Sequence, residues 1–249
     1  MSSFFRVTGA VLYKDVLIEA RSRETLLSML VFAVLVGLIF TFAVFVDRSI
    51  VRKIAPGIFW VAITFAGTLG LSRSFARERE SGGMRGLLLT PAGRGALFAG
   101  KMLANVLFMT TVELVLLPLF GILFDLPLWE VSGPLAGVVL LGTIGFAAVG
   151  TLFAAMLENA RLREVLLPVI FYPIVVPVVI AGVKATAGLL ASAELDEAAN
   201  MATSASAAIL GRSAAAAHAE VWGWVQILLA YDVICLATST WIFEHLVTE

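Results

Sequence analysis

Hydrophobic residues along this chain gather into six long, nearly uncharged runs. The runs cover residues 26–46, 57–72, 102–124, 134–157, 165–183 and 222–243. A bilayer core about 30 Å thick is crossed by roughly 20 apolar residues in a helix. Because only closed hydrogen-bonding structures satisfy the backbone in lipid, the pattern predicts six transmembrane helices. We therefore expect an all-α integral membrane protein with a single transmembrane domain over residues 1–249.

The first 25 residues precede these runs and predict an amphipathic helix that lies at the membrane interface. Apolar side chains share one helical face, at Phe4, Val7, Val11 and Ile18. Basic side chains point away from that face, at Arg6, Arg21 and Arg23. Asp15 and Glu19 interrupt the pattern and make the amphipathicity moderate. The alternative is a solvated basic segment that anchors the first span.

The composition agrees with a membrane protein and excludes a soluble enzyme. Hydrophobic residues make up 60% of the chain and charged residues 14%, and the mean hydropathy is +1.00. Soluble domains carry roughly 25% charged residues. A net charge of −1 gives no reason to expect a nucleic-acid partner. Cys235 is the only cysteine, which excludes an intramolecular disulfide and a Cys-rich metal site.

Lys and Arg residues predict the orientation of the chain. Twelve of the 17 fall in the N-terminal segment and the connections over 73–101 and 158–164. Positively charged connections stay on the cytoplasmic side, so both termini are expected there. The Ala-rich segment 185–220 then becomes an external loop, in which one or two short helices could form.

The cytoplasmic connection 73–101 carries the strongest functional signal. Gly82-Gly83 and Thr90-Pro91 bound a predicted short helix over 84–89. Its charged edges and three leucines suit docking into a groove on a partner protein. A solvated basic loop, the alternative, would not explain the leucines. The candidate contact residues are Glu78, Arg79, Glu80, Gly82, Gly83, Met84, Arg85, Leu87, Leu88, Leu89, Thr90 and Pro91.

A second motif in this connection resembles the phosphate-binding loop of nucleotide-binding proteins. Residues 95–101 fit the G-x-x-x-x-G-K start of a phosphate-binding loop. The next residue is Met102, which has no hydroxyl to hold Mg²⁺, and no strand is predicted before it. We expect no ATP site in this chain, so any ATP hydrolysis would belong to a separate chain.

The connection 73–101 resembles the coupling loop of ABC-2-type (type V) exporter permeases. The matching pattern runs from Arg79-Glu80 through Thr90-Pro91 to Gly100-Lys101. Two further elements resemble the heme exporter B (CcmB) subunits of cytochrome c maturation within that family. They are Ala55-Pro-Gly-Ile-Phe-Trp60-Val-Ala and the proline-rich fifth span with Pro168, Pro173 and Pro177.

The resemblance implies a permease subunit that is not itself an enzyme. Two copies would pair in the bacterial cytoplasmic membrane and bind an ATP-binding subunit of the CcmA type. The heme-handling subunits CcmC and CcmD and the heme chaperone CcmE would be further partners, with heme as possible cargo rather than a bound cofactor. Glu158, Arg161 and Arg163 form a second cytoplasmic contact candidate.

Two acids and a tyrosine lie within apolar spans. Glu113 and Asp232 occur near the middle of spans 3 and 6, and Tyr172 lies in span 5. Acids at this depth usually face the bundle interior or a cavity. They could line a route, or hold the two spans together by sharing a proton; the alternative is a protonated acid hydrogen-bonded within the bundle. Gly133 and Gly137 fit close small-xxx-small helix packing.

Two other functions stay open at this point. An ABC-2 permease could export a lipid, glycan or drug instead. More distantly, Glu113 and Asp232 could serve a proton-coupled secondary transporter that needs no ATPase.

Overall fold

In the computed structural model the described residues are 2–43, 48–81, 93–157, 160, 162–202 and 204–246. They form seven helices and no strand: α1 (Ser2–Ser22), α2 (Glu24–Ala43), α3 (Arg48–Ser81), α5 (Arg94–Phe124), α6 (Ser132–Met156), α7 (Arg163–Met201) and α8 (Ser204–Leu246). Six of these, α2 through α8, are long and apolar enough to cross a membrane. The predicted all-α membrane fold with six spans is confirmed.

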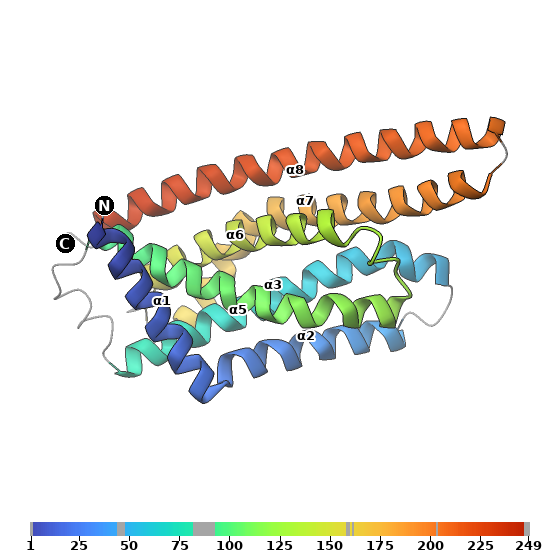
Figure 1. Cartoon of the computed structure of the whole chain (residues 1–249). Coiled ribbons are helices and arrows are strands. Elements are labelled where there is room, and N and C mark those ends of the chain that lie inside the picture. The colour runs from blue at the N-terminus through green and yellow to red at the C-terminus, as the bar shows by residue number, and fades with distance from the viewer. Residues whose placement is uncertain are drawn as a thin grey trace.

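The six long helices run side by side, and α1 crosses them obliquely at one end of the bundle (Figure 1). We call this the terminal end, because α1 begins and α8 finishes there, and the opposite end the distal end. The chain turns from α1 into α2 at Arg23, whose φ of 56° lies in the left-handed region. That conformation is uncommon outside glycine, and it lets α1 leave the axis of α2 within one residue.

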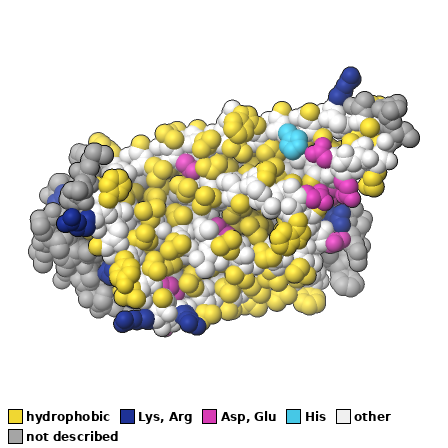
Figure 2. Space-filling view, in the orientation of Figure 1, with side chains coloured by type: hydrophobic (Ala, Val, Ile, Leu, Met, Phe, Trp, Pro, Cys, Tyr) yellow, Lys and Arg dark blue, Asp and Glu magenta, His cyan; other side chains and the backbone are white. Residues whose placement is uncertain are grey.

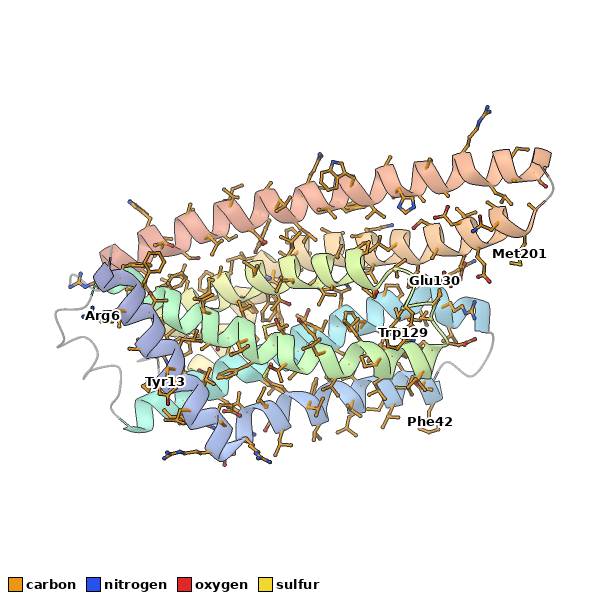
Figure 3. All side chains as sticks on the ribbon, in the orientation of Figure 1. Arg6, Tyr13, Phe42, Trp129, Glu130 and Met201 are labelled. Atoms are coloured by element: carbon orange, nitrogen blue, oxygen red, sulfur yellow. The ribbon has the colours of Figure 1, made fainter. Side chains whose placement is uncertain are left out.

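The surface of the bundle matches a lipid environment. Hydrophobic side chains cover the middle of the face shown in Figure 2, and most of the Lys and Arg side chains visible there lie toward the terminal end. Two highly exposed aromatic residues lie toward opposite ends, Tyr13 on α1 and Trp129 after α5 (Figure 3). Amphipathic rings of this kind are enriched at the two membrane interfaces.

The α7–α8 hairpin reaches beyond the other helices at the distal end. Met201, at the tip of α7, lies farther out than Trp129 and Glu130 (Figure 3). The two helices hold 39 and 43 residues, and at 1.5 Å per residue a helix of about 40 residues is roughly twice as long as a bilayer core is thick. The expectation of a loop with short helices over 185–220 is therefore wrong, because α7 continues to Met201 and α8 begins at Ser204. Ala favours helix, and each helix packs along the other, so both exceed the length that a bilayer core needs.

Trp60 of α3 holds the centre of the bundle together. Its buried ring fills the space that a Cβ would need at Gly142 of α6 and at Gly182 of α7. The indole N–H donates a hydrogen bond to Oγ1 of Thr186 on α7, at 3.1 Å. Glycine at these two positions lets three helices approach one large side chain. Gly133 and Gly137 make no such close packing with the described residues, because a Cβ there would meet none of their atoms within 4 Å.

The two kinds of glycine on α6 give a matched test. Gly142→Ala would push a methyl group into the Trp60 ring, and overpacking of this kind costs about 1–3 kcal/mol. We expect a lower melting temperature for the purified protein in detergent. Gly137→Ala, five positions away on the same helix, should leave the melting temperature unchanged or slightly raised. Equal melting temperatures for the two variants would contradict the assigned role of Trp60.

Candidate functional site

Helix α1 places a partly polar face against the bundle. Four side chains spaced by three or four residues are nearly inaccessible to solvent. They are Thr8, Val11, Asp15 and Glu19, at 8, 3, 8 and 2% exposure. Phe4 and Ile18 remain exposed on the outside of the helix. The sequence suggested that Asp15 and Glu19 interrupt the amphipathic pattern of this helix. In the structure they instead attach the helix to the bundle.

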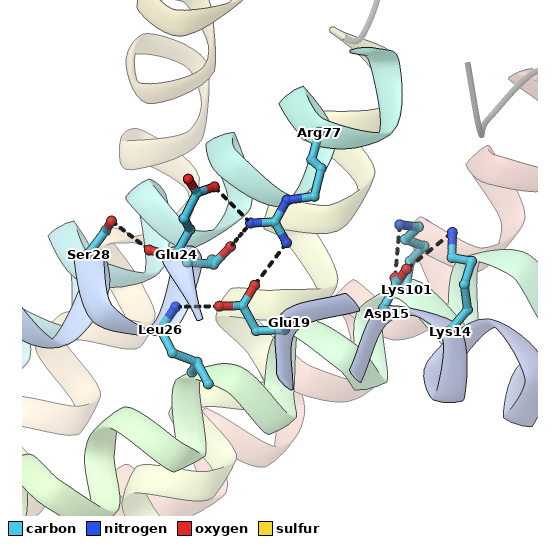
Figure 4. A network of polar contacts seen from close by, with 9 residues as sticks. Lys14, Asp15, Glu19, Glu24, Leu26, Ser28, Arg77 and Lys101 are labelled. Carbon is cyan, nitrogen blue, oxygen red and sulfur yellow. Dashed lines mark hydrogen bonds and ion pairs between the residues drawn. The ribbon is translucent and has the colours of Figure 1, made fainter. Parts of the chain in front are cut away.

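The carboxylate of Glu19 joins α1 to α2 and α3 (Figure 4). Arg77 of α3 donates to it through Nη1 at 3.0 Å, and the backbone N–H of Leu26 donates to its other oxygen at 2.8 Å. Leu26 lies in the first turn of α2, so the carboxylate caps an N–H group that has no partner within the helix. Arg77 also reaches Glu24 and Thr25, at 3.4 and 3.3 Å.

These contacts decide the charge of Glu19. Burial alone would raise the pKa of this carboxyl. The hydrogen bonds from Leu26, Thr25 and Arg77 outweigh that effect, together with the positive charge of Arg77, and the pKa lies below its ordinary value. A lowered pKa means that Glu19 stabilises the fold above its unfolded-state pKa, and that this contribution is lost as the pH falls through the folded-state pKa.

Asp15, one turn earlier on α1, makes the corresponding connection to α5. Its carboxylate lies 2.8 Å from Nζ of Lys101, and the two side chains are 8 and 6% exposed. Lys14 approaches the same carboxylate at 3.1 Å from the exposed side. The Lys101 ammonium also lies 5.6 Å from the centre of the Phe75 ring, close enough for a cation–π interaction.

The backbones of α1 and α5 approach closely beside this ion pair. A Cβ at Gly100 would meet Val11 at 2.8 Å, and the Thr8 hydroxyl donates to the carbonyl of Ala96 at 3.2 Å. The segment that imitates a phosphate-binding loop therefore lies inside helix α5. Its glycine gives room to α1, and its lysine pairs with Asp15.

We refer to the ion pairs Glu19–Arg77 and Asp15–Lys101 as the α1 clamp. Arg77 lies in the last turns of α3 and Lys101 in the second turn of α5. These are the two helices that flank residues 82–92 in the sequence. The α1 clamp thus fastens one helix to both sides of the predicted coupling loop. Sequence analysis missed it, because its partners are 58 and 86 positions apart, and only the same-face spacing of Asp15 and Glu19 hinted at it.

Most of the predicted contact residues lie outside the part of the chain that the structure describes. Glu78, Arg79 and Glu80 belong to the last turn of α3, but their side chains are not described. Arg163 is the first residue of α7, and its side chain is not described either. The undescribed ones are Gly82, Gly83, Met84, Arg85, Leu87, Leu88, Leu89, Thr90, Pro91, Glu158 and Arg161.

The two intramembrane acids are buried but do not meet. The Thr143 hydroxyl of α6 donates to Glu113, whereas Asp232 lies against Gly145 of α6. Positions 143 and 145 point about 200° apart on a helix, because each residue turns it by about 100°. No hydrogen bond or ion pair between the two carboxylates occurs among the described residues, so a shared proton has no support. Tyr172 packs edge-on against Phe65 at 5.6 Å.

The α1 clamp gives a stability prediction. Glu19→Gln removes the charge that Arg77 faces and should cost about 1.5–3 kcal/mol, the range for hydrogen bonds to charged groups. We expect a lower melting temperature at pH 7 and, as the pH falls from 7 through the folded-state pKa of Glu19, a smaller loss of stability than in the wild type. Thermal unfolding at several pH values measures both.

Glu24→Gln is the matched control, because Glu24 contacts the same guanidinium from a side chain that is 69% exposed. Exposed ion pairs contribute about 0–1 kcal/mol. A control that loses as much stability as Glu19→Gln would contradict the assignment of the buried carboxylate as the connecting group.

Comparison with known proteins places the chain in a family. The family model "CcmB protein" matches residues 6–211. The heme exporter protein B of Rhodobacter capsulatus is 33% identical over 181 residues, which are 70% of this chain and 80% of that protein. Those of Paracoccus denitrificans and Pseudomonas aeruginosa are 32 and 29% identical, over 71% of this chain in each case and 80 and 78% of theirs. The chain belongs to the CcmB family.

Proposed function

We propose that this chain is the membrane permease subunit of an ABC transporter complex in cytochrome c biogenesis. A separate ATP-binding subunit of the CcmA type would supply the energy, and CcmC, CcmD and the heme chaperone CcmE would complete the pathway on the outer face. The name heme exporter protein B, carried by the relatives, supports heme as the cargo of the complex. The α1 clamp is the observation in the molecule that supports coupling to another chain.

The argument for coupling is mechanical. A partner that moves residues 78–91 would move the end of α3 and the start of α5. Both helices are fastened to α1 by buried ion pairs, and Glu19 extends the connection to the start of α2. Losing one hydrogen bond to a charged group costs about 1.5–3 kcal/mol, so these helix ends resist separation. Movement of the loop would therefore shift four helix ends together instead of bending one connection.

This proposal needs the terminal end on the cytoplasmic side, where ATP is available. The positive charge of residues 73–101 and of the N-terminal segment supports that orientation. Single cysteines placed within residues 78–91 should resist impermeant thiol reagents in intact cells and react after permeabilisation. Labelling in intact cells would exclude contact with a cytoplasmic ATPase.

The functional test separates binding of the ATPase from coupling to it. Leu88→Asp with Leu89→Asp should abolish co-purification with the ATP-binding subunit, since the leucines are the predicted docking surface. Asp15→Asn should leave co-purification intact and reduce ATP-dependent release of the heme-loaded chaperone at least tenfold. The exchange of Asp15→Lys with Lys101→Asp should restore part of that release. Release at the wild-type rate in Asp15→Asn would contradict the mechanical role.

Two alternatives have less support. An ABC-2 permease for another substrate would share the α1 clamp, and the absence of CcmC and CcmE partners from the purified complex would favour it. A proton-coupled transporter would need Glu113 and Asp232 to act together, and they contact α6 separately. ATP-independent transport by the chain alone in liposomes, driven by a pH gradient, would favour this second alternative.

A further inference from the structure

A cavity of about 500 Å³ opens at the distal end of the bundle, far from the α1 clamp. The start of α3, the turn after α5 and the outer half of α7 form its walls. Arg52, Lys53 and Glu194 bring charge to it. The volume lies within the range of about 300–1,000 Å³ that is usual for small-molecule sites.

Arg52, one of the two cations at this cavity, has a hydrogen-bond donor that lacks an acceptor among the described residues. Arg52 donates through Nη2 to Asp125 at 2.8 Å, and Nη1 lies 3.6 Å from Glu194. Its Nε–H is enclosed and has no acceptor among the described residues. Enclosed donors nearly always have an acceptor, so an acceptor from beyond the described residues is indicated. Lys53, the next residue, is exposed. A carboxylate or phosphate suits such a pair of donors, because it offers several charged oxygens.

The rest of the cavity is apolar. Pro56, Leu126 and Leu190 line it and also line the tightly packed apolar region beneath it. Trp129, 86% exposed, follows this wall by two residues and marks the depth of the membrane interface. A molecule that fits both parts therefore has an anionic group and an apolar body, and it reaches the site from the membrane surface.

We propose that this cavity binds the anionic group of an amphipathic molecule, held by Arg52 Nε–H and Lys53 Nζ with its apolar part against Pro56 and Leu126. Two sources share this chemistry, the phosphate of a phospholipid and the propionate carboxylates of a porphyrin. The site does not depend on coupling to an ATPase. Binding of a porphyrin would deepen the proposed function, since heme carries such carboxylates.

The experiment uses the purified full-length chain in a nonionic maltoside detergent, without ATP or partner proteins. Protoporphyrin IX is titrated by quenching of tryptophan fluorescence, with its dimethyl ester as the ligand that lacks the charge. Dioctanoyl phosphatidylglycerol is titrated by native mass spectrometry, with dioctanoylglycerol as the corresponding uncharged ligand. Retained melting temperature shows that each variant is folded.

Three variants test the geometry. Lys53→Gln removes a charge, and Arg52→Lys keeps the charge that faces Asp125 and Glu194 but removes the Nε–H. Each should weaken binding of the acidic ligand at least about tenfold, the effect of losing one charged hydrogen bond. Ala191→Trp places a large ring in the cavity and should weaken binding of both acidic ligands. Arg212→Gln, an exposed cation on the α7–α8 hairpin outside the cavity, should leave the affinity unchanged.

The outcomes separate the sources. Charge-dependent binding of protoporphyrin alone, of the phospholipid alone or of both supports the site and identifies its ligand. Equal affinity for charged and uncharged ligands, or unchanged affinity in all three cavity variants, overturns the proposal. Because neither ATP nor another subunit is present, failure here leaves the coupling proposal unaffected, and failure of coupling leaves this site unaffected.

Discussion

The carboxylates of Glu19 and Asp15 determine how the terminal end of this protein is assembled. Both are buried beside lipid-facing helices, where an ionised group without a partner would be costly. Each finds its cation on a different helix, Arg77 on α3 and Lys101 on α5. The position of α1 is thus fixed by two charges as well as by apolar packing, and its apolar outer face stays available to the membrane. An amphipathic helix attached in this way belongs to the bundle as well as to the interface.

Helix α3 is the element through which the rest of the structure is connected. Arg77 holds it to α1 and α2 at the terminal end, and Trp60 holds it to α6 and α7 in the middle. Arg52 holds it to Asp125 and to Glu194 of α7 at the distal end. A displacement of α3 therefore reaches nearly every other helix through a named polar or packing contact. The Trp60 ring also explains the glycines at position 142 of α6 and position 182 of α7, since a Cβ at either would overlap it.

The sequence was sufficient to predict the six spans, because long uncharged runs have one stable conformation in lipid. The sequence did not predict the full length of α7 and α8. The apolar run ends at Lys184 and the acidic residues after it, but a helix can continue beyond the apolar segment. It also misjudged Asp15 and Glu19, because helical periodicity assigns a charged residue to the outside unless its partner is known. The Thr143 partner of Glu113 was missed for the same reason: it is 30 positions away.

The length of the α7–α8 hairpin has a geometric consequence. Two continuous helices packed along each other resist bending, so any tilt of the hairpin about the contact between Trp60 and Gly182 would move both helices together. A rod that extends about 28 Å past its pivot and tilts by about 5° moves its tip by roughly 2.5 Å, more than the rise of one helical residue. Rotations too small to disturb the packing at the centre are thereby enlarged where the hairpin leaves the membrane.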